Sequence, residues 1–282
     1  MISFFETTLY RLGTNYLDVY LLHGLDDFWC DKAEDIDAWG FLNSLKESGN
    51  AKSIGFSFHG SPEKLNDVLS AHPEIDFVQL QINYVDWFDP KIKSKQLYET
   101  ARKHNVPIIV MEPAKGGLLS NDKLPAFQSL KNVHPAWSLS SWAMKFVNSL
   151  EGVSIVLSGM NRESQLLDNI NVFSNGLTLA ESERSLLFET ALLLRNMPRI
   201  DCTSCGYCMN VCPRGIKIPI LIDLLNDYQV YKSFSNFLHM YNMFTEDGTK
   251  ASLCINCKQC EKRCPQKLNI SDIIHTIRTI VD

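Results

Sequence analysis

The chain has 282 residues, of which 45% are hydrophobic and 21% are charged, and its formal net charge is −5. This length allows one large domain and one smaller domain, and the acidic balance argues against a nucleic-acid-binding surface, which would be basic. No apolar run is long enough to span a membrane, and the N-terminal residues lack the basic stretch of a secretion signal. The sequence therefore predicts a cytoplasmic protein without a nucleic-acid or membrane partner.

The first two-thirds of the chain alternates short apolar runs with amphipathic stretches. The runs, expected to be strands, are residues 17–22, 53–57, 77–81, 108–111 and 153–157. The stretches, expected to be helices, are residues 35–48, 62–71, 92–104, 135–148 and 164–173, with Asp35 and Ser61 as N-caps and Gly49 as a stop. Short runs without polar alternation are typical of strands buried on both faces. Repeated βα units predict a parallel sheet or a (β/α)8 barrel.

Polar residues and glycines follow the apolar runs, where a barrel enzyme would place its chemistry. They include His23, Ser57, Gln79 and Gly159. The acidic stretch at residues 26–35 is interpreted as a solvated loop and helix start. Cys30 within it is interpreted as a packed thiol without a role.

Eight of the nine cysteines form two copies of the pattern C-x2-C-x2-C-x3-C-P. The first copy is Cys202, Cys205, Cys208 and Cys212, and the second is Cys254, Cys257, Cys260 and Cys264. This spacing is typical of proteins with two [4Fe–4S] clusters, in which the fourth cysteine of each run binds the other cluster. We therefore predict one cluster held by Cys202, Cys205, Cys208 and Cys264, and another held by Cys254, Cys257, Cys260 and Cys212. Gly206 is expected to let the backbone approach a cluster.

Two other uses of these cysteines fit the pattern less well. Zinc sites commonly use two C-x2-C pairs separated by a longer spacer. Disulfides are rare in a reducing cytosol. In the spacer between the two cysteine runs, residues 221–244 carry apolar residues at helical spacing. The tail at residues 271–282 has an isoleucine stripe behind Ser271, an expected N-cap. The cysteine-rich part is therefore expected to be a small α-helical ferredoxin-like domain.

Five segments together resemble the aldo/keto reductase family, in the branch that carries a C-terminal four-iron ferredoxin domain. They are RLGTNYLDVYLLH, KSIGFSFHG, FVQLQINY, VMEPAKGGLL and VLSGMNRESQLLDNI. The resemblance implies an α/β fold in two parts. Residues 1–195 would form a partial (β/α)8 TIM barrel, its last five βα units, and residues 196–282 a domain with two [4Fe–4S] clusters.

The resemblance also implies roles for individual residues. His23 corresponds to the active-site histidine that orients the substrate carbonyl, and Ser57 and Gln79 to positions that hold the nicotinamide carboxamide. Met111 stands where many members place a tyrosine that stacks on the nicotinamide ring. The positions around the pyrophosphate and adenine are Gly159, Gln165 and Asn169. None of these three is a cation that would read a 2′-phosphate, so the choice between NAD and NADP stays open.

The family's first three βα units, with the Asp, Tyr and Lys of its catalytic tetrad, have no counterpart in this sequence. Tyr84 and Lys115 lie near strand ends but are not expected to replace them. Because five strands do not close an eight-stranded barrel, we expect a fragment or truncated gene product with exposed sheet edges, which aggregates when expressed alone.

Two functions stay open. One is an NAD(P)H-linked oxidoreductase that acts on a small carbonyl or alcohol, with a ferredoxin or flavoprotein as possible electron partner. The other is an iron–sulfur electron-transfer or docking protein in which the truncated barrel is not catalytic, or is only a remnant.

Overall fold

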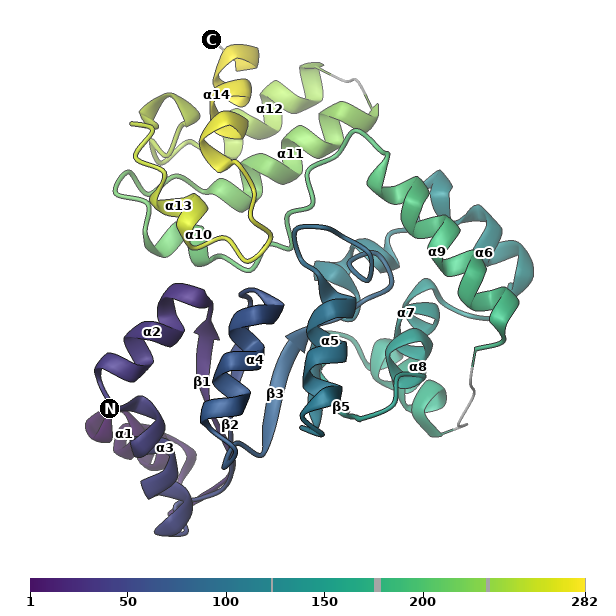
Figure 1. Ribbon diagram of the computed structural model, residues 1–282. Coiled ribbons are helices and arrows are strands. Elements are labelled where there is room, and N and C mark those ends of the chain that lie inside the picture. Colours follow the sequence, from purple (N-terminus) through teal and green to yellow (C-terminus); the bar gives the residue numbers. More distant parts are fainter. Residues whose placement is uncertain (123, 175–178, 232–233, 282) are drawn as a thin grey trace. The chain divides into compact units, whose positions relative to one another are not determined.

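The computed structural model describes residues 1–122, 124–174, 179–231 and 234–281 (Figure 1). Contacts divide the chain into two compact units. The first unit comprises Met1–Ala114 and Asp122–Ala191, and the second comprises Lys115–Asn121 and Leu192–Asp282. The division expected at residues 195 and 196 did not anticipate that the short segment Lys115–Asn121 groups with the second unit.

The first unit contains a five-stranded parallel sheet with the strands in sequence order. Its strands are β1 (Leu17–Leu25), β2 (Ala51–Phe58), β3 (Phe77–Gln81), β4 (Ile108–Met111) and β5 (Val153–Val156). Strands β2, β3 and β4 are mostly buried, whereas the edge strands β1 and β5 expose Val19 and Ile155. The predicted α/β class with five parallel strands is therefore confirmed. The sheet has two edge strands, β1 and β5, as expected of a sheet that does not close into a barrel.

Helices precede, connect and follow the strands of the first unit, and the last of them continues past Ala191, where the first unit ends. They are α1 (Ile2–Leu12), α2 (Asp27–Asp35), α3 (Ala38–Glu47), α4 (Pro62–Ala71), α5 (Ser94–Lys103), α6 (Gln128–Val133), α7 (Leu139–Asn148), α8 (Glu163–Ser174) and α9 (Glu181–Arg195), with a 3-10 turn, η2 (Pro125–Phe127). Figure 1 shows α4 and α5 lying across one face of the sheet. Each parallel crossover thus passes through a helix, as βα units require.

The first crossover corrects two predictions. Asp35 does not cap a helix, because α2 ends there and α3 begins after Asp37, whose side chain accepts a hydrogen bond from the Gly40 N–H at 3.3 Å. The acidic stretch is not a loop but forms α2, capped by Asp26, which accepts from the Trp29 N–H at 2.8 Å. Asp26 and Asp37 thus each cap a short helix, so two helices stand where one was expected to begin at Asp35.

Two further helix boundaries depend on serine caps. Ser61 caps α4 as predicted, since its hydroxyl accepts from the Lys64 N–H at 3.2 Å. The helix expected from residue 135 begins only at Leu139, because Ser138 caps it and accepts from the Ser141 N–H at 2.9 Å. The prediction was wrong there by several residues, since the prolyl turn before Ser138 was assigned to the helix.

The second unit is mainly helical, as predicted, in the part of the chain that the structure describes. Its helices are α10 (Tyr207–Asn210), α11 (Ile218–Tyr231), α12 (Phe234–Phe244), α13 (Gln259–Lys262) and α14 (Ile270–Val281), with two 3-10 segments, η1 (Lys115–Ser120) and η3 (Ala251–Leu253). Lys232 and Ser233 of the spacer and Asp282 of the tail lie outside the described residues. No described helix is long and apolar enough to cross a membrane.

Ser271 is not the N-cap of the last helix, which begins one residue earlier at Ile270. The cap comes instead from Glu261, whose carboxylate accepts from the Ser271 N–H at 2.9 Å and from its hydroxyl. The carboxylate thereby satisfies one of the free N–H groups in the first turn. A cap supplied by a residue ten positions earlier was not visible in the local pattern.

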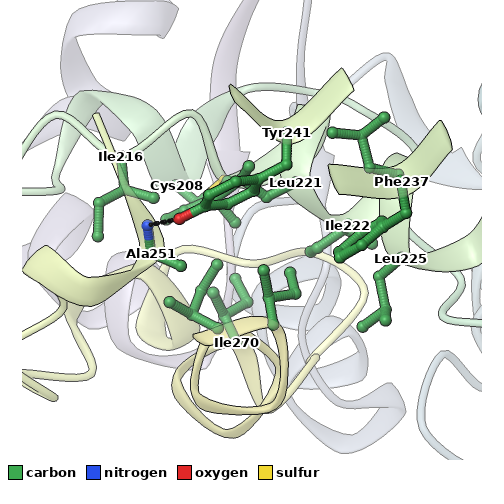
Figure 2. Close-up of a cluster of buried hydrophobic side chains, with 13 residues drawn as sticks. Cys208, Ile216, Leu221, Ile222, Leu225, Phe237, Tyr241, Ala251 and Ile270 are labelled. Atoms are coloured by element: carbon green, nitrogen blue, oxygen red, sulfur yellow. Dashed lines mark hydrogen bonds between the residues drawn. The ribbon is translucent and has the colours of Figure 1, made fainter. Parts of the chain in front are cut away.

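Buried aliphatic and aromatic side chains form the core of the second unit (Figure 2). Helices α11, α12 and α14 supply most of them, and Cys208 belongs to the same cluster. The Tyr241 hydroxyl accepts a hydrogen bond from the Ala251 N–H at 2.9 Å, and both residues are buried. This bond joins α12 to η3, directly before the second cysteine run.

Replacing Tyr241 by phenylalanine is expected to lower the unfolding free energy of the second unit by roughly 1–3 kcal/mol. The buried Ala251 N–H loses its acceptor, while the ring stays in place. Chemical denaturation followed by circular dichroism measures the loss. The matched control is Tyr228→Phe, because the Tyr228 hydroxyl makes no hydrogen bond with any described residue. Equal effects of the two substitutions would contradict the prediction.

Candidate functional site

The two cysteine runs share one backbone conformation. In the first run the residues with positive φ are Ser204 (55°), Gly206 (81°) and Gly215 (64°), and in the second they are Asn256 (55°), Lys258 (57°) and Lys267 (52°). Each of the three residues in the first run lies 52 positions before its counterpart in the second run, and Cys202 lies 52 positions before Cys254. The helices that follow, α11 and α14, begin with the same offset. The duplicated spacing is therefore also a duplicated structure, in which Gly206 and Lys258 occupy the same left-handed turn position. Glycine adopts this conformation without a steric cost, whereas a lysine does not.

The cysteines line two cavities in the second unit. The first cavity is lined by Cys202, Cys205, Cys208 and Cys264. The second cavity is lined by Cys254, Cys257, Cys260 and Cys212. Each run thus supplies three thiols to one cavity and its last thiol to the other. The two groups of cysteines are those that the sequence analysis assigned to the two clusters. That they bind clusters stays a prediction.

The thiols surround the cavities instead of converging on one point. All nine cysteines are free. Among the described residues, no group of three or more His, Cys, Asp or Glu side chains is arranged to hold a single metal ion. Four sulfurs around an open space suit a polynuclear group, whose irons each take one thiolate.

Burial governs the acidity of these thiols. It raises the pKa of Cys208 to about 12 and that of Cys260 to about 11. Burial also raises the pKa of Cys264, and the backbone N–H groups of Leu268, Gln266 and Lys267 oppose this by bonding to its sulfur. Because metals bind the thiolate, loading the cavities must release protons, and these N–H groups then stabilise the sulfur charge.

In the first unit, four predicted residues lie toward the carboxyl ends of neighbouring strands. Ser57 and Gln79 are partners in the β2–β3 register. The buried Ser57 hydroxyl accepts from the Gly24 N–H at 2.7 Å, and Gln79 Nε2 donates to Met111 Sδ at 3.4 Å. His23 lies on β1 next to β2 and is exposed. The structure thus brings His23, Ser57, Gln79 and Met111 to one edge of the sheet.

The residues predicted around the pyrophosphate and adenine lie after β5. Gly159 is exposed in the loop. Gln165 Oε1 accepts from the N–H groups of Asn161 at 2.8 Å and Arg162 at 3.2 Å. Asn169 Nδ2 donates to Ser158 Oγ at 2.9 Å. Gln165 and Asn169 therefore shape this loop, and their contact with a nucleotide stays a prediction.

One carboxylate that sequence reasoning did not single out organises the loop after β3. Asp86 accepts from Gln81 Nε2 at 2.8 Å and from Asn83 Nδ2 at 2.7 Å, and all three residues are buried. Asn83 also donates to the Glu112 carbonyl at 3.1 Å, which joins this loop to the end of β4. The Asn-x-x-Asp spacing, a turn signal, would have indicated Asp86.

That Tyr84 and Lys115 do not replace the missing proton donor stays a prediction, and the structure gives the surroundings of both residues. Tyr84 is buried, and burial raises the pKa of its hydroxyl. A general acid needs the opposite, a pKa closer to the working pH. Lys115 belongs to the second unit and donates to Gln266 Oε1 at 3.4 Å.

Fold and cavities together define a protein made of a partial (β/α) barrel and a helical module with two cysteine-lined sites. The aldo/keto reductase family model matches residues 1–185, and the 4Fe-4S dicluster domain model matches residues 201–270. The chain belongs to the aldo/keto reductase family and carries a 4Fe-4S dicluster domain behind the reductase part.

Known relatives are similar to the reductase part. An aldo-keto reductase of Mycolicibacterium vanbaalenii is 29% identical over 177 residues, covering 61% of this chain and 57% of that protein. The glyoxal reductase of Bacillus subtilis is 25% identical over 184 residues, covering 64% of this chain and 59% of that protein. The chain therefore spans less than two-thirds of the length of these relatives.

Solved structures show the same fold. An aldo-keto reductase from Klebsiella pneumoniae in complex with NADPH superposes with a TM-score of 0.51 at 19% identity, covering 65% of this chain and 61% of that one. The aldo-keto reductase AKR11C1 from Bacillus halodurans gives a TM-score of 0.51 at 22% identity, and the match covers 67% of this chain and 65% of that one. At these identities the likeness establishes the fold of the reductase part.

Proposed function

We propose that this protein is an iron–sulfur oxidoreductase. Two [4Fe–4S] clusters are held in the second unit, and the reductase-type unit binds NAD(P)H and acts on a small carbonyl or alcohol. The observation that carries the proposal is the composition of the two cavities. Each collects four thiols, three from one run and the fourth from the other.

The residues around the cavities fit such a group in further respects. The Ser204 N–H bonds to Cys202 Sγ at 3.4 Å, and three N–H groups bond to Cys264. Donors aimed at ligand sulfurs stabilise an anionic cluster and set its reduction potential. Bound clusters would supply one-electron chemistry, while these N–H groups would stabilise the charge on the sulfurs.

The reductase part supports the nicotinamide half of the proposal. The Ser57 hydroxyl accepts from Gly24 and retains a proton that it can donate to a carboxamide oxygen. Gln79 is the register partner of Ser57 and offers a side-chain amide that can pair with the nicotinamide carboxamide. The exposed His23 is the residue that would orient a carbonyl. The aldo-keto reductase from Klebsiella pneumoniae, which shares this fold, was solved in complex with NADPH, and this supports the proposed cofactor.

A second function is an electron-transfer or docking protein whose barrel is not catalytic. Its support is that burial raises the pKa of the Tyr84 hydroxyl and that Lys115 donates to Gln266, neither of which favours proton donation to a substrate. Nicotinamide moves a hydride, which carries two electrons, whereas a cluster moves one. A flavin usually converts between the two, so a ferredoxin or flavoprotein is the proposed electron partner.

Anaerobic purification of the full chain is expected to give about eight iron and eight acid-labile sulfide ions per chain, since two clusters of the four-iron type are proposed. Dithionite should produce the EPR signal of reduced clusters. The same signal with NADH or NADPH favours the oxidoreductase, whereas reduction only by a reduced ferredoxin favours the electron-transfer protein. Colourless protein without iron or sulfide contradicts both.

A further inference from the structure

The segment Lys115–Asn121 follows β4 and belongs to the second unit. It begins with three consecutive residues of positive φ, namely Lys115 (47°), Gly116 (61°) and Gly117 (91°). A Cβ on Gly116 would lie 2.6 Å from the carbonyl oxygen of Thr203, the residue after Cys202. Such a backbone persists only where its surroundings fix it. The segment is therefore held against the first cysteine run.

Lys115 is buried in this arrangement, with only 3% of its surface exposed. Its Nζ donates to Gln266 Oε1 at 3.4 Å, and Gln266 is also buried. Gln266 lines the first cavity, and its backbone N–H bonds to the sulfur of Cys264. Gln266 thus links the ammonium group of Lys115 to the first cavity and to the sulfur of Cys264.

We propose that Lys115 raises the reduction potential of the cluster in the first cavity, both through its charge and by positioning Gln266. This inference rests on the proposed function only in requiring that the cavities hold clusters. Four thiolates make a bound cluster anionic, and reduction adds one more negative charge, so a nearby positive charge favours the reduced form. Burial strengthens this effect because the local dielectric is low.

The second cavity has cations of a different kind. Arg214 and Lys258 line it, and both are exposed to solvent. Water and salt screen exposed charges over distances near 8 Å at physiological ionic strength. Among the residues that the structure describes, a deeply buried lysine therefore serves the first cavity and not the second. Lys258 offers a matched control.

The test is an EPR-monitored redox titration of the anaerobically purified chain and its Lys115→Gln variant. At a fixed applied potential, the reduced-to-oxidised ratio of one cluster should fall about tenfold, which is about 59 mV for a one-electron couple. The other cluster should stay unchanged, and Lys115→Arg should retain the original ratio. Lys258→Gln should affect only the other cluster, by a smaller factor that disappears at high salt.

Cysteine variants assign the shift to a cavity. With Cys257→Ala, where only the first cavity is expected to be filled, the Lys115→Gln shift should remain. With Cys205→Ala it should vanish. If Lys115→Gln fails to assemble clusters, Gln266→Glu replaces it, because a carboxylate there neutralises the ammonium group and should lower the same potential.

The outcomes separate the two proposals. A wild-type chain without iron contradicts the proposed function itself. The role of Lys115 is overturned if both clusters are present and Lys115→Gln shifts neither reduction potential, or shifts both equally. Either result leaves the cluster assignment intact.

Discussion

Replacing Cys212 by alanine is expected to remove the cluster that the second cysteine run holds, although Cys212 belongs to the first run. The reason is that Cys212 lines the cavity of Cys254, Cys257 and Cys260. A cluster that loses one of its four thiolates loses the protein ligand of one iron. Iron and sulfide content should therefore fall from about eight to about four of each per chain.

Double variants make this prediction decisive. Cys212→Ala combined with Cys257→Ala should still leave one cluster, because both thiols line the same cavity. Cys212→Ala combined with Cys205→Ala should leave none, because the two thiols line different cavities. The reverse result would mean that each run binds its own cluster. Cys30→Ala is the control, since burial raises the pKa of that thiol to about 12 and it lies outside both cavities.

The parts of the fold that short-range patterns encode were predicted from the sequence. The strands were found because each is a compact apolar run, and the structure extends only the first two appreciably, to Leu17–Leu25 and Ala51–Phe58. The cysteine sets were proposed from spacing alone, because ligand geometry constrains residues that are close in sequence. Ser61 was identified as a cap because a cap bonds to a residue only three positions later in the chain.

Features that depend on distant residues were missed. Glu261 caps α14 from ten residues away, and Lys115 meets Gln266 across 151 residues. The pair Gly116-Gly117 was interpreted as a turn signal, which is correct locally, but its contact with Thr203 depends on the packing of the second unit. Asp35 failed as a cap because Asp37 competes for the same helix, and propensity alone does not rank two such neighbours.

Removing the iron from the protein is expected to unfold the second unit selectively. Its hydrophobic core includes Cys208, and five further cysteines pack against that core, namely Cys202, Cys212, Cys254, Cys260 and Cys264. Metal binding contributes to the folding free energy of small metal-binding modules, so the second unit loses that contribution when the iron is removed. After anaerobic chelation, amide protection in α11 and α14 should fall on the order of 100-fold, which corresponds to about 2.8 kcal/mol.

Hydrogen exchange resolves this loss by segment. The amides of β2, β3 and β4 should keep their protection, because those strands are buried by the first unit's own helices and sheet neighbours. Leu118 and Leu119 provide the sharpest comparison, since both are buried and lie only a few residues beyond β4, yet belong to the second unit. Their protection should fall with that of α11. If it stays with β4 instead, the segment is organised by the sheet, and the cysteine sites do not hold Lys115 in place.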